Sequence, residues 1–421
     1  MKIMVKKHRK ILPSIFKWLD RDETIVISGP RRVGKTTTLY LLKDELLSRG
    51  IPPQNIIMLN LEDIDILKEL SGSPKALLKF MVAGAGKNYF LIDEIQYLKE
   101  PTNFLKYHFD ANRDRIKLIV TGSYLFEVKG EFRDSLVGRK VSFDLTPLTF
   151  EEFIDFRKPD LLPFLKKSDL PEVRKNELLS LLDEYLVYGG MPEVVQAEDV
   201  EIKQMLLKEY VNTYLQKDIR YISGSNDILR YNDLLSILAN QISGLLNIEE
   251  VSNTLGLRRD KVVKYLENLI LSGIVYLIPP FYTNIRTQIS KMKKVFLFDV
   301  GIRNRIINNF NHPLYRMDAG ALYENWVLNE LINAVGKENV FYYRTRSGSE
   351  IDFVVKEAIP VPFEVKYKKL VKPTGIRALR NFLEKNRLPR GYLINLTLNQ
   401  SLPEKNIEIV DYLRFLQMIW K

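Results

Sequence analysis

The chain has 421 residues, 46% of them hydrophobic, and 63 Lys and Arg against 52 Asp and Glu give it a net charge of +11. This length exceeds one ordinary compact core, so we expect about two to four domains. No apolar run approaches the roughly 20 residues that span a bilayer. With no cysteine and three histidines, the composition excludes disulfides and thiolate zinc sites and argues against a histidine-rich metal centre. We therefore expect a cytoplasmic protein without a membrane partner, whose metal ligands are oxygens.

The positive charge has two interpretations. An excess of Lys and Arg favours polyanionic partners such as nucleic acid. The same excess can serve solubility alone. Where the charge lies along the chain decides between the two.

The first chemical motif joins a predicted strand to a predicted helix. Residues 7–20 have the apolar spacing of a helix and lead into a strand over 24–28. Residues 29–36 read GPRRVGKT and fit the phosphate-binding P-loop spacing G-x-x-x-x-G-K-[ST]. The glycines let backbone N–H groups point at an anion, Lys35 is predicted to contact the β- and γ-phosphates of ATP, and Thr36 to ligate Mg²⁺. The residues predicted to bind the nucleotide are Gly29, Pro30, Arg31, Arg32, Val33, Gly34, Lys35, Thr36, Thr37, Asp93 and Ser123.

The second motif is a pair of carboxylates at the end of an apolar strand. Strands are predicted over residues 55–61 and 88–94, with a helix over 74–82 between them. The later strand ends in Asp93 and Glu94, as in a Walker B motif. Asp93 is predicted to hold the Mg²⁺ shell, and Glu94 to polarise the water that attacks the γ-phosphate.

Two further strands, over residues 117–120 and 140–145, bring one candidate residue each. Ser123 is a candidate γ-phosphate sensor, or a strand-end cap. Arg139 is a candidate arginine finger, in cis or on a neighbouring subunit of a homo-oligomer, or a solvated charge. The alternation of strands and helices over residues 1–150 predicts a parallel sheet with helices on both faces.

Four stretches together resemble the prokaryotic AAA-type ATPase family with a nuclease-like C-terminal domain: residues 29–36, 91–96 (LIDEIQ), 121–123 (TGS) and 145–153 (LTPLTFEEF). The resemblance runs over nearly the whole chain. It implies an additional-strand (ASCE) P-loop core that binds and hydrolyses ATP. One departure is Tyr124, where the family commonly has a small polar residue.

The next part of the chain is predicted to be mostly helical, over residues 151–157, 171–186 and 202–218. The interruption at residues 188–195 again resembles the family. Helices beside a P-loop sheet either form a lid that moves with the hydrolysis state or pack as a static layer. Both alternatives stay open at this point.

A different pattern follows, three helices and then two strands. The helices are predicted over 228–242, 247–255 and 258–272, and the strands over 273–278 and 294–298. A helix, a tight turn and a basic helix form a helix-turn-helix pattern, and the strands could pair as the wing of a winged helix. The candidate nucleic-acid contacts are Arg258, Arg259, Lys261, Lys264, Lys291 and Lys293. Winged helices also bind proteins, so a DNA partner and a protein partner are both open.

Acidic residues fall on successive elements of the C-terminal part. Asp352 lies on one predicted strand and Glu364 with Lys366 on the next, which resembles the restriction-endonuclease-like (PD-(D/E)XK) superfamily, and Glu324 on the preceding helix matches the extra acidic ligand of that superfamily. Strand alternation puts Glu364 and Lys366 on one face. Glu324, Asp352 and Glu364 are therefore candidate Mg²⁺ ligands, and Lys366 a candidate catalytic lysine near the attacking water. Glu350 is either a spare ligand or a solvated charge.

These expectations describe an α/β multidomain protein. The predicted domains are a P-loop ATPase core (1–150), a helical lid or linker (151–222), a winged helix (223–313) and a nuclease-like domain (314–421). The leading hypothesis is an ATPase that uses ATP and Mg²⁺, with Lys35, Glu94 and Arg139 as catalytic residues, and couples hydrolysis to DNA binding or processing. The alternative is a nucleotide-gated regulator or protein-interaction switch whose nuclease-like domain is inactive.

Overall fold

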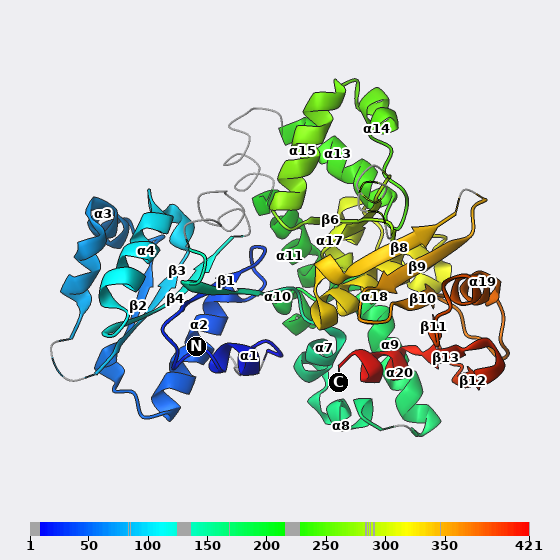
Figure 1. The fold of residues 1–421 in the computed structure, drawn as a ribbon, viewed down its shortest axis with the longest axis horizontal. Coiled ribbons are helices and arrows are strands. Elements are labelled where there is room, and N and C mark those ends of the chain that lie inside the picture. Colours follow the sequence, from blue (N-terminus) through cyan, green and yellow to red (C-terminus); the bar gives the residue numbers. More distant parts are fainter. Residues whose placement is uncertain are drawn as a thin grey trace. The chain divides into compact units, whose positions relative to one another are not determined.

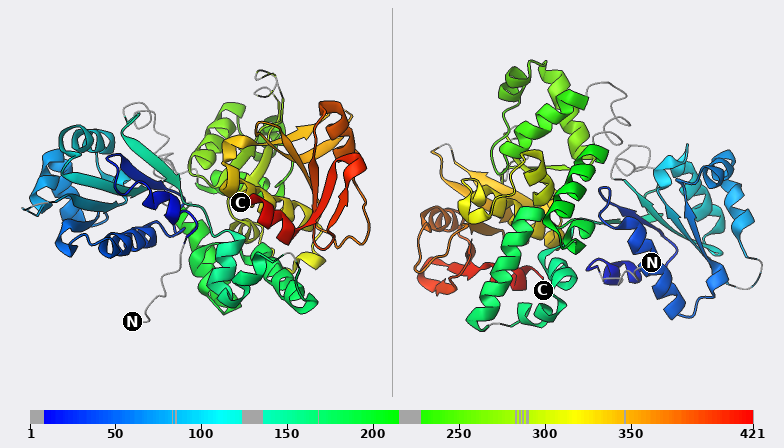
Figure 2. Two further views of the ribbon diagram at one scale, coloured as in Figure 1. Left: turned by 60° about the horizontal axis from the view of Figure 1, so that its bottom comes forward. Right: turned by 180° about the vertical axis from the view of Figure 1, so that it is seen from behind.

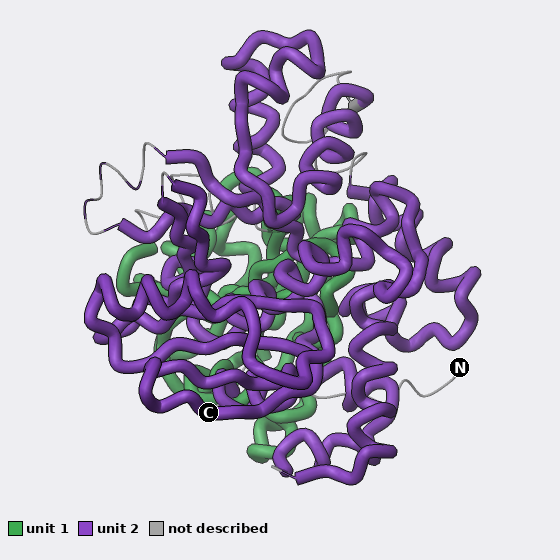
Figure 3. Tube along the Cα trace, turned by 90° about the vertical axis from the view of Figure 1, so that its right-hand side faces the viewer, with its two compact units in different colours: residues 1–146, 271–273 green, residues 147–270, 274–421 purple. Residues whose placement is uncertain are grey.

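The computed structural model describes residues 9–420 except 83, 85, 124–135, 168, 215–227, 283, 285, 287, 289, 290 and 346. The chain forms two compact units, coloured green and purple in Figure 3. The first runs to Thr146 and includes Leu271–Gly273, and the second consists of Pro147–Ile270 and Ile274–Lys421. Apart from Leu271–Gly273, the three predicted C-terminal domains fall within the second unit, and the boundaries between them stay predictions.

The first unit is built on a parallel five-stranded sheet in the order β2-β3-β4-β1-β5. Its strands are β1 (Thr24–Ser28), β2 (Ile56–Asn60), β3 (Asn88–Asp93), β4 (Ile116–Gly122) and β5 (Lys140–Asp144). Every residue of β1, β3 and β4 is buried, as expected of near-continuous apolar strands in a parallel sheet. Strand β4 lies between β1 and β3, which is the additional-strand arrangement that the resemblance implied. The predicted parallel sheet is confirmed.

Helices cover both faces of this sheet (Figure 2). The helices are α1 (Leu12–Phe16), α2 (Lys35–Ser48), α3 (Ile64–Gly72) and α4 (Pro101–Asn112), with 3-10 helices η1 (Pro53–Asn55), η2 (Pro74–Phe80) and η3 (Ile95–Tyr97). On one face, alternate residues of β3 such as Phe90 and Ile92 share a buried cluster with Phe104 and Leu105 of α4. This alternation follows from the two-residue period of a strand.

The helical predictions in this unit were partly wrong. The helix predicted over residues 74–82 is the 3-10 helix η2, and the helix predicted from residue 7 is reduced to α1 within the described residues. Helix α3 was not predicted. Its start is set by Asp63, whose side chain accepts hydrogen bonds from the backbone N–H groups of Asp65 and Ile66, so the capping signal was present in the sequence.

In the second unit, helices α7 (Phe150–Arg157), α8 (Leu162–Leu165), α9 (Glu172–Tyr188), α10 (Pro192–Gln196) and α11 (Val200–Thr213) follow the boundary. Thr149 and Glu152 form a capping box at the start of α7. The Phe150 backbone N–H donates to Glu330 Oε1 at 2.7 Å, and the Phe150 ring lies 6.0 Å from that of Trp326. These helices thus form part of the core of the second unit, which favours the static layer over a lid. The predicted helix over 202–218 ends outside the described residues.

The predicted three-helix and two-strand pattern is present. It consists of α13 (Ile228–Asn240), α14 (Ile248–Leu255), α15 (Arg259–Leu271) and the antiparallel strands β6 (Val275–Ile278) and β7 (Lys294–Leu297). Gly256 ends α14 in the left-handed conformation (φ 61°), which a glycine adopts at little cost. Between α13 and α14, Ser243 N–H donates to Val295 O at 2.7 Å and Val295 N–H donates to Gly244 O at 3.0 Å, so this segment pairs with β7.

The C-terminal sheet is mixed and has the order β12-β13-β11-β10-β9-β8. Its strands are β8 (Val340–Arg344), β9 (Glu350–Val355), β10 (Val361–Val365), β11 (Gly391–Asn395), β12 (Gln400–Leu402) and β13 (Ile407–Asp411). Helix α18 (Ala319–Val335) precedes these strands, and α19 (Arg377–Asn386) lies between β10 and β11 in the chain. Helix α20 (Tyr412–Ile419) follows β13 and is the last element (Figure 1). The chain order α18-β8-β9-β10-α19-β11 places Glu324, Asp352 and Glu364 on neighbouring elements.

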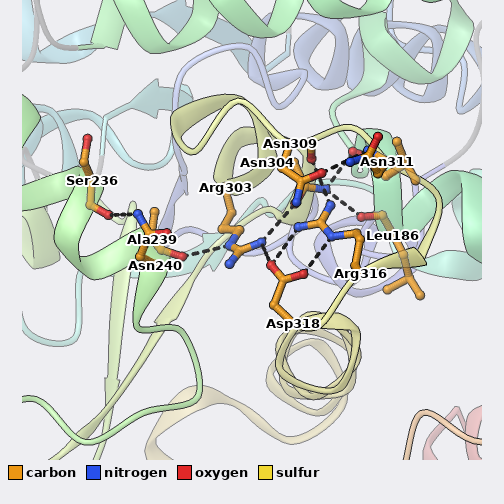
Figure 4. A network of polar contacts seen from close by, with 11 residues as sticks. Leu186, Ser236, Ala239, Asn240, Arg303, Asn304, Asn309, Asn311, Arg316 and Asp318 are labelled. Carbon is orange, nitrogen blue, oxygen red and sulfur yellow. Dashed lines mark hydrogen bonds and ion pairs between the residues drawn. The ribbon is translucent and has the colours of Figure 1, made fainter. Parts of the chain in front are cut away.

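A buried polar network joins α17 (Val300–Ile306) to the surrounding helices (Figure 4). Arg303 is 1% exposed, and its Nε donates to Ala239 O in α13 at 2.8 Å. Asn304 Nδ2 donates to Leu186 O in α9 at 2.8 Å. Hydrogen bonds from Arg316 and then Arg303 hold the pKa of Asp318 well below its usual range. The network therefore fixes α9 and α13 around α17 through charges that are paired rather than isolated.

Candidate functional site

The P-loop lies between β1 and α2, and its glycines are required by space and by conformation. A Cβ atom on Gly29 would lie 2.3 Å from Leu145 O, a separation that no side chain permits. Gly34 caps α2 in the left-handed region with φ 98°, which disfavours any residue with a side chain. Lys35 is 5% exposed, and its Nζ donates to Gly29 O and Pro30 O, each at 3.0 Å. The loop thus folds around its own lysine.

The predicted magnesium ligands lie side by side at the carboxyl edge of the sheet. The Thr36 hydroxyl donates to Asp93 Oδ2 at 2.6 Å. The Thr121 hydroxyl donates to the other carboxylate oxygen, Asp93 Oδ1, and accepts a hydrogen bond from Glu94 N–H at 3.1 Å. The hydroxyl and carboxylate oxygens are the hard ligands that Mg²⁺ prefers, so the residues fit this ion. Thr121 holds both carboxylate residues and was not singled out from the sequence.

Gln96 connects the predicted catalytic base to the end of β4. Its Nε2 donates to Glu94 Oε2, and its Oε1 accepts from the Ser123 backbone N–H at 3.3 Å. Glu94 itself has a positive φ of 58°, a conformation uncommon for residues other than glycine. Ser123 thus lies at the edge of the sheet that holds Glu94, and its sensor role stays a prediction. An amide two residues after Glu94 was the signal in the sequence.

The placement of Arg139 corrects its predicted role in cis. Arg139 O accepts from Thr24 N–H at 2.9 Å at the amino end of β1, whereas the P-loop follows the carboxyl end of β1 after Ser28. Its Nε forms an ion pair of 2.7 Å with Asp110 Oδ1. Because the two ends of a parallel strand lie at opposite edges of the sheet, Arg139 does not face the phosphate site of its own chain. A role on a neighbouring copy stays a prediction.

Arg9 is another residue that sequence reasoning missed. It is 6% exposed. One guanidinium nitrogen donates to Val33 O in the P-loop at 2.8 Å, and the other donates to Thr146 O at 2.6 Å. This side chain therefore joins the phosphate-binding loop to the last residue of the first unit. A single arginine before a helix gives no recognisable pattern in the sequence.

The predicted metal ligands of the C-terminal part belong to a cluster of four carboxylates, of which two are buried and two half-buried. This group is here called the carboxylate cluster: Glu324 on α18, Glu350 and Asp352 on β9, and Glu364 on β10. The Lys366 Nζ donates to Glu364 Oε1 at 2.6 Å, so these two side chains share a face as predicted. Asp352 Oδ2 accepts from Val365 N–H at 2.7 Å. Burial, and then the neighbouring Asp352, raise the pKa of Glu364 to about 7 against the opposite effect of Lys366.

The carboxylate cluster also contains an unpredicted lysine, Lys294 of β7. Its Nζ lies 3.7 Å from Asp352 Oδ1 and 3.8 Å from Glu324 Oε2, and it forms a closer ion pair with Glu350. Burial lowers its pKa, but these carboxylates raise it more, so the pKa of Lys294 lies above its usual value. Among the described residues, no group of three His, Cys, Asp or Glu side chains is placed to hold a metal ion. The predicted Mg²⁺ site at Glu324, Asp352 and Glu364 therefore does not fit a metal as it stands, because an ammonium lies among its ligands.

The candidate nucleic-acid residues lie on α15, in the turn before it, and just before β7. Arg258 is 88% exposed and pairs with Asp260 at 3.2 Å, and Arg259 pairs with Glu249 at 3.1 Å. Lys264 is exposed, and Lys261 Nζ lies 5.5 Å from the centroid of the Tyr265 ring. Lys291 is exposed and Lys293 is half-buried. Acidic neighbours thus offset part of the positive charge of this surface.

Comparisons with known proteins divide the chain into three matched regions. Residues 21–154 match the family model "AAA domain", residues 179–312 match "Domain of unknown function (DUF8612)", and residues 319–415 match "Domain of unknown function (DUF4143)". Within the part of the chain that the structure describes, no helix combines the length and apolar composition needed to cross a membrane.

Two curated relatives align with most of this chain. A protein of Haemophilus influenzae is 28% identical over 373 residues, which is 84% of this chain and 86% of the relative. A protein of Methanocaldococcus jannaschii is 26% identical over 430 residues, 99% of this chain and 92% of the relative. Among solved structures, the Walker-type ATPase of Pyrococcus abyssi is 18% identical, with 70% of this chain and 93% of that chain covered and a TM-score of 0.46. The P-loop part of this protein is similar in sequence to the AAA domain, and its sheet is parallel, with the strand order β2-β3-β4-β1-β5.

Proposed function

We propose that this protein is a Mg²⁺-dependent ATPase that couples ATP binding and hydrolysis to binding or processing of DNA. The observation that carries the proposal is the hydrogen bond of 2.6 Å between Thr36 of the P-loop and Asp93 at the end of β3. It brings the predicted metal ligands together at the carboxyl edge of the sheet, where ligands of open α/β folds bind. The sequence similarity of residues 21–154 to the AAA domain supports the same reaction.

Each residue of the site has a part in this reaction. Lys35 releases the carbonyls of Gly29 and Pro30 and contacts the β- and γ-phosphates instead. Thr36 and Asp93 would hold Mg²⁺, which would supply positive charge to neutralise the phosphates. Glu94 orients and polarises the attacking water, and Gln96 keeps its carboxylate in position. Lys35 must exchange its hydrogen bonds to the loop for contacts with the phosphates, whereas the carboxylates of Asp93 and Glu94 are already held by hydrogen bonds.

For the DNA-binding part, we propose a winged helix made of α13, α14, α15 and the β6–β7 hairpin. The order of these elements supports it, as does the exposure of Arg258, Arg259 and Lys264 on and beside α15, the helix that would enter a groove. Lys261, Lys291 and Lys293 add to the charge that would contact phosphates. Arg139 is proposed to act on a neighbouring copy in a homo-oligomer.

The second candidate function is a nucleotide-gated regulator whose nuclease-like C-terminal part does not cleave DNA. Lys294 favours it, because its ammonium lies among Glu324, Glu350 and Asp352 where a metal-dependent nuclease needs its ion. In this alternative, Lys366 and Glu364 are structural, and the winged helix contacts DNA or a protein partner.

The experiment is Mg²⁺-dependent ATP hydrolysis with and without duplex, single-stranded and branched DNA, for the wild type, Lys35→Ala and Glu94→Gln. The proposal expects hydrolysis that one form of DNA stimulates and that both variants lose. Hydrolysis that no DNA changes would leave the ATPase and favour the regulator with a protein partner. Hydrolysis that survives in both variants would contradict the assignment of this site.

A further inference from the structure

The carboxylate cluster is neutralised from inside the protein by a lysine of a different element. Lys294 is the first residue of β7, and its side chain is 2% exposed. Its ammonium contacts Glu350 and Asp352 of β9 and lies 3.8 Å from Glu324 of α18. A buried ammonium is stable only when paired in this way, because it has given up its hydration.

The strand that carries Lys294 is fastened on both sides of it. Asn325 of α18 accepts from Leu297 N–H at 2.9 Å and donates to Leu297 O at 2.7 Å. On the other side, the Tyr342 hydroxyl of β8 donates to Met292 O at 2.5 Å, and the ring of Tyr342 lies 5.7 Å from Lys294 Nζ. These hydrogen bonds hold the backbone on both sides of Lys294 against α18 and β8. They thereby position its ammonium in the carboxylate cluster.

We propose that Lys294 is a tethered cation that occupies the carboxylate cluster in place of a divalent metal ion, so that a metal ion binds there only when the lysine is withdrawn or removed. The inference does not depend on the ATPase. It explains why three predicted ligands lie on neighbouring elements without forming a metal site. A divalent ion bound to the same oxygens would lie beside the ammonium. Two positive charges at so short a distance repel each other strongly in a buried site.

The oxygens of the carboxylate cluster suit a hard divalent cation once Lys294 is removed. Glu364 Oε2 is buried and has no hydrogen-bond partner among the described residues, so one carboxylate oxygen is left for a ligand. Val365 N–H fixes the orientation of Asp352 through a hydrogen bond of 2.7 Å. Mg²⁺ and Mn²⁺ favour such oxygen ligands. Removal of the Lys294 ammonium should therefore create a binding site for a divalent ion rather than a cavity lined by carboxylates without a counter-ion.

The test is Mn²⁺ binding to the full chain without nucleotide, measured by the loss of the free-ion electron paramagnetic resonance signal. Lys294→Met should bind about one Mn²⁺ per chain more than the wild type. The double variant Lys294→Met with Asp352→Asn should lose this extra ion. Lys294→Arg keeps the positive charge and is the matched control, for which no extra ion is expected.

Two results would overturn the proposal. One is a wild-type protein that binds an Mn²⁺ ion that Asp352→Asn abolishes, since the lysine would then not exclude metal. The other is a Lys294→Met protein that keeps the wild-type circular dichroism spectrum but gains no ion. If Lys294→Met does not fold, the comparison of the wild type with Asp352→Asn still decides, because the proposal requires their Mn²⁺ binding to be equal.

Discussion

The Thr36 hydroxyl donates a hydrogen bond of 2.6 Å to Asp93 Oδ2, which joins the start of α2 to the end of β3 across the intervening strand β4. The other oxygen of the same carboxylate accepts from Thr121 at the end of β4. Asp93 is thus held by hydroxyls from two elements before any ion binds.

Replacement of Thr36 by Ala should lower Mg²⁺-dependent ATP hydrolysis by about 10–100-fold, the usual cost when a metal loses a ligand or its supporting group. Thr36→Ser keeps the hydroxyl and is the matched control, expected to retain most of the activity. The measurement is the hydrolysis rate as a function of Mg²⁺ concentration. A Thr36→Ala enzyme with the Mg²⁺ dependence of the wild type would show that this hydroxyl does not serve the ion.

Replacement of Thr121 by Val should leave Asp93 Oδ1 and Glu94 N–H without their shared partner while the size of the side chain is kept. We expect a loss of about 1–3 kcal/mol in the free energy of unfolding of the first unit, because Asp93 is buried and Glu94 is half-buried. Weaker Mg²⁺-nucleotide binding should accompany it, and Thr121→Ser should restore both. The checks are urea unfolding and nucleotide titration. Nucleotide binding unchanged in Thr121→Val would assign Thr121 to the core alone.

The sequence was sufficient to identify functional residues that lie close together in the chain and have a well-known chemical role. The P-loop is eight consecutive residues, and Asp93 ends an apolar strand, so both could be identified without knowing the fold. The parallel sheet followed from the alternation of strands and helices. Thr121 was within reach of the same reasoning, because it begins the polar strand end that pointed to Ser123.

The sequence could not show which residues far apart in the chain contact each other. Nothing near Lys294 distinguishes it from Lys291 or Lys293, and its partner Asp352 lies on a strand of a different sheet. Likewise, Arg139 looked suitable as a finger because it precedes a strand, but only the direction of β5 shows which edge of the sheet it occupies. Long-range packing decides such cases, and periodicity does not report it.

If α15 contacts DNA, Lys264→Ala should weaken binding and reduce the slope of log affinity against log salt by about 1, the loss of one phosphate contact. Lys79 in the first unit is also exposed, at 72%, and Lys79→Ala is the control for an equal loss of net charge. Fluorescence anisotropy at several salt concentrations measures both. Equal effects of the two variants would mean that binding responds to net charge and not to α15.

His108 of α4 should make the stability of the first unit depend on pH. It is 1% exposed, its Nε2 lies 2.8 Å from Pro74 O, and burial lowers its pKa to about 4. The unfolded chain, with an ordinary histidine pKa of about 6.5, binds the proton first, so the free energy of unfolding should fall by about 3 kcal/mol as the pH drops from 7 through 4.

The variant His108→Gln isolates this contribution, since its amide can still donate to Pro74 O but does not titrate. Hydrogen exchange of peptides from β3 and β4 reports on the first unit alone. The variant should lose part of the acid sensitivity of the wild type, while the remainder comes from carboxylates. An identical pH dependence in both proteins would mean that the pKa of His108 does not change on folding.

Gly29→Ala should damage the P-loop through the fold rather than through the phosphate. The added Cβ would lie 2.3 Å from Leu145 O and 3.2 Å from Val33 Cγ2, so the backbone of the loop or of the segment after β5 must shift. We expect a loss of about 1–3 kcal/mol in unfolding free energy, as in overpacked cores, with nucleotide binding weakened by at least about tenfold because the loop N–H groups move.

Gly72 at the end of α3 is the matched control. Nothing lies within 4 Å of its added Cβ, so Gly72→Ala should be neutral or stabilising by up to about 1 kcal/mol. Equal nucleotide affinities for the two variants would mean that the loop absorbs the clash and that Gly29 is not required by its approach to Leu145.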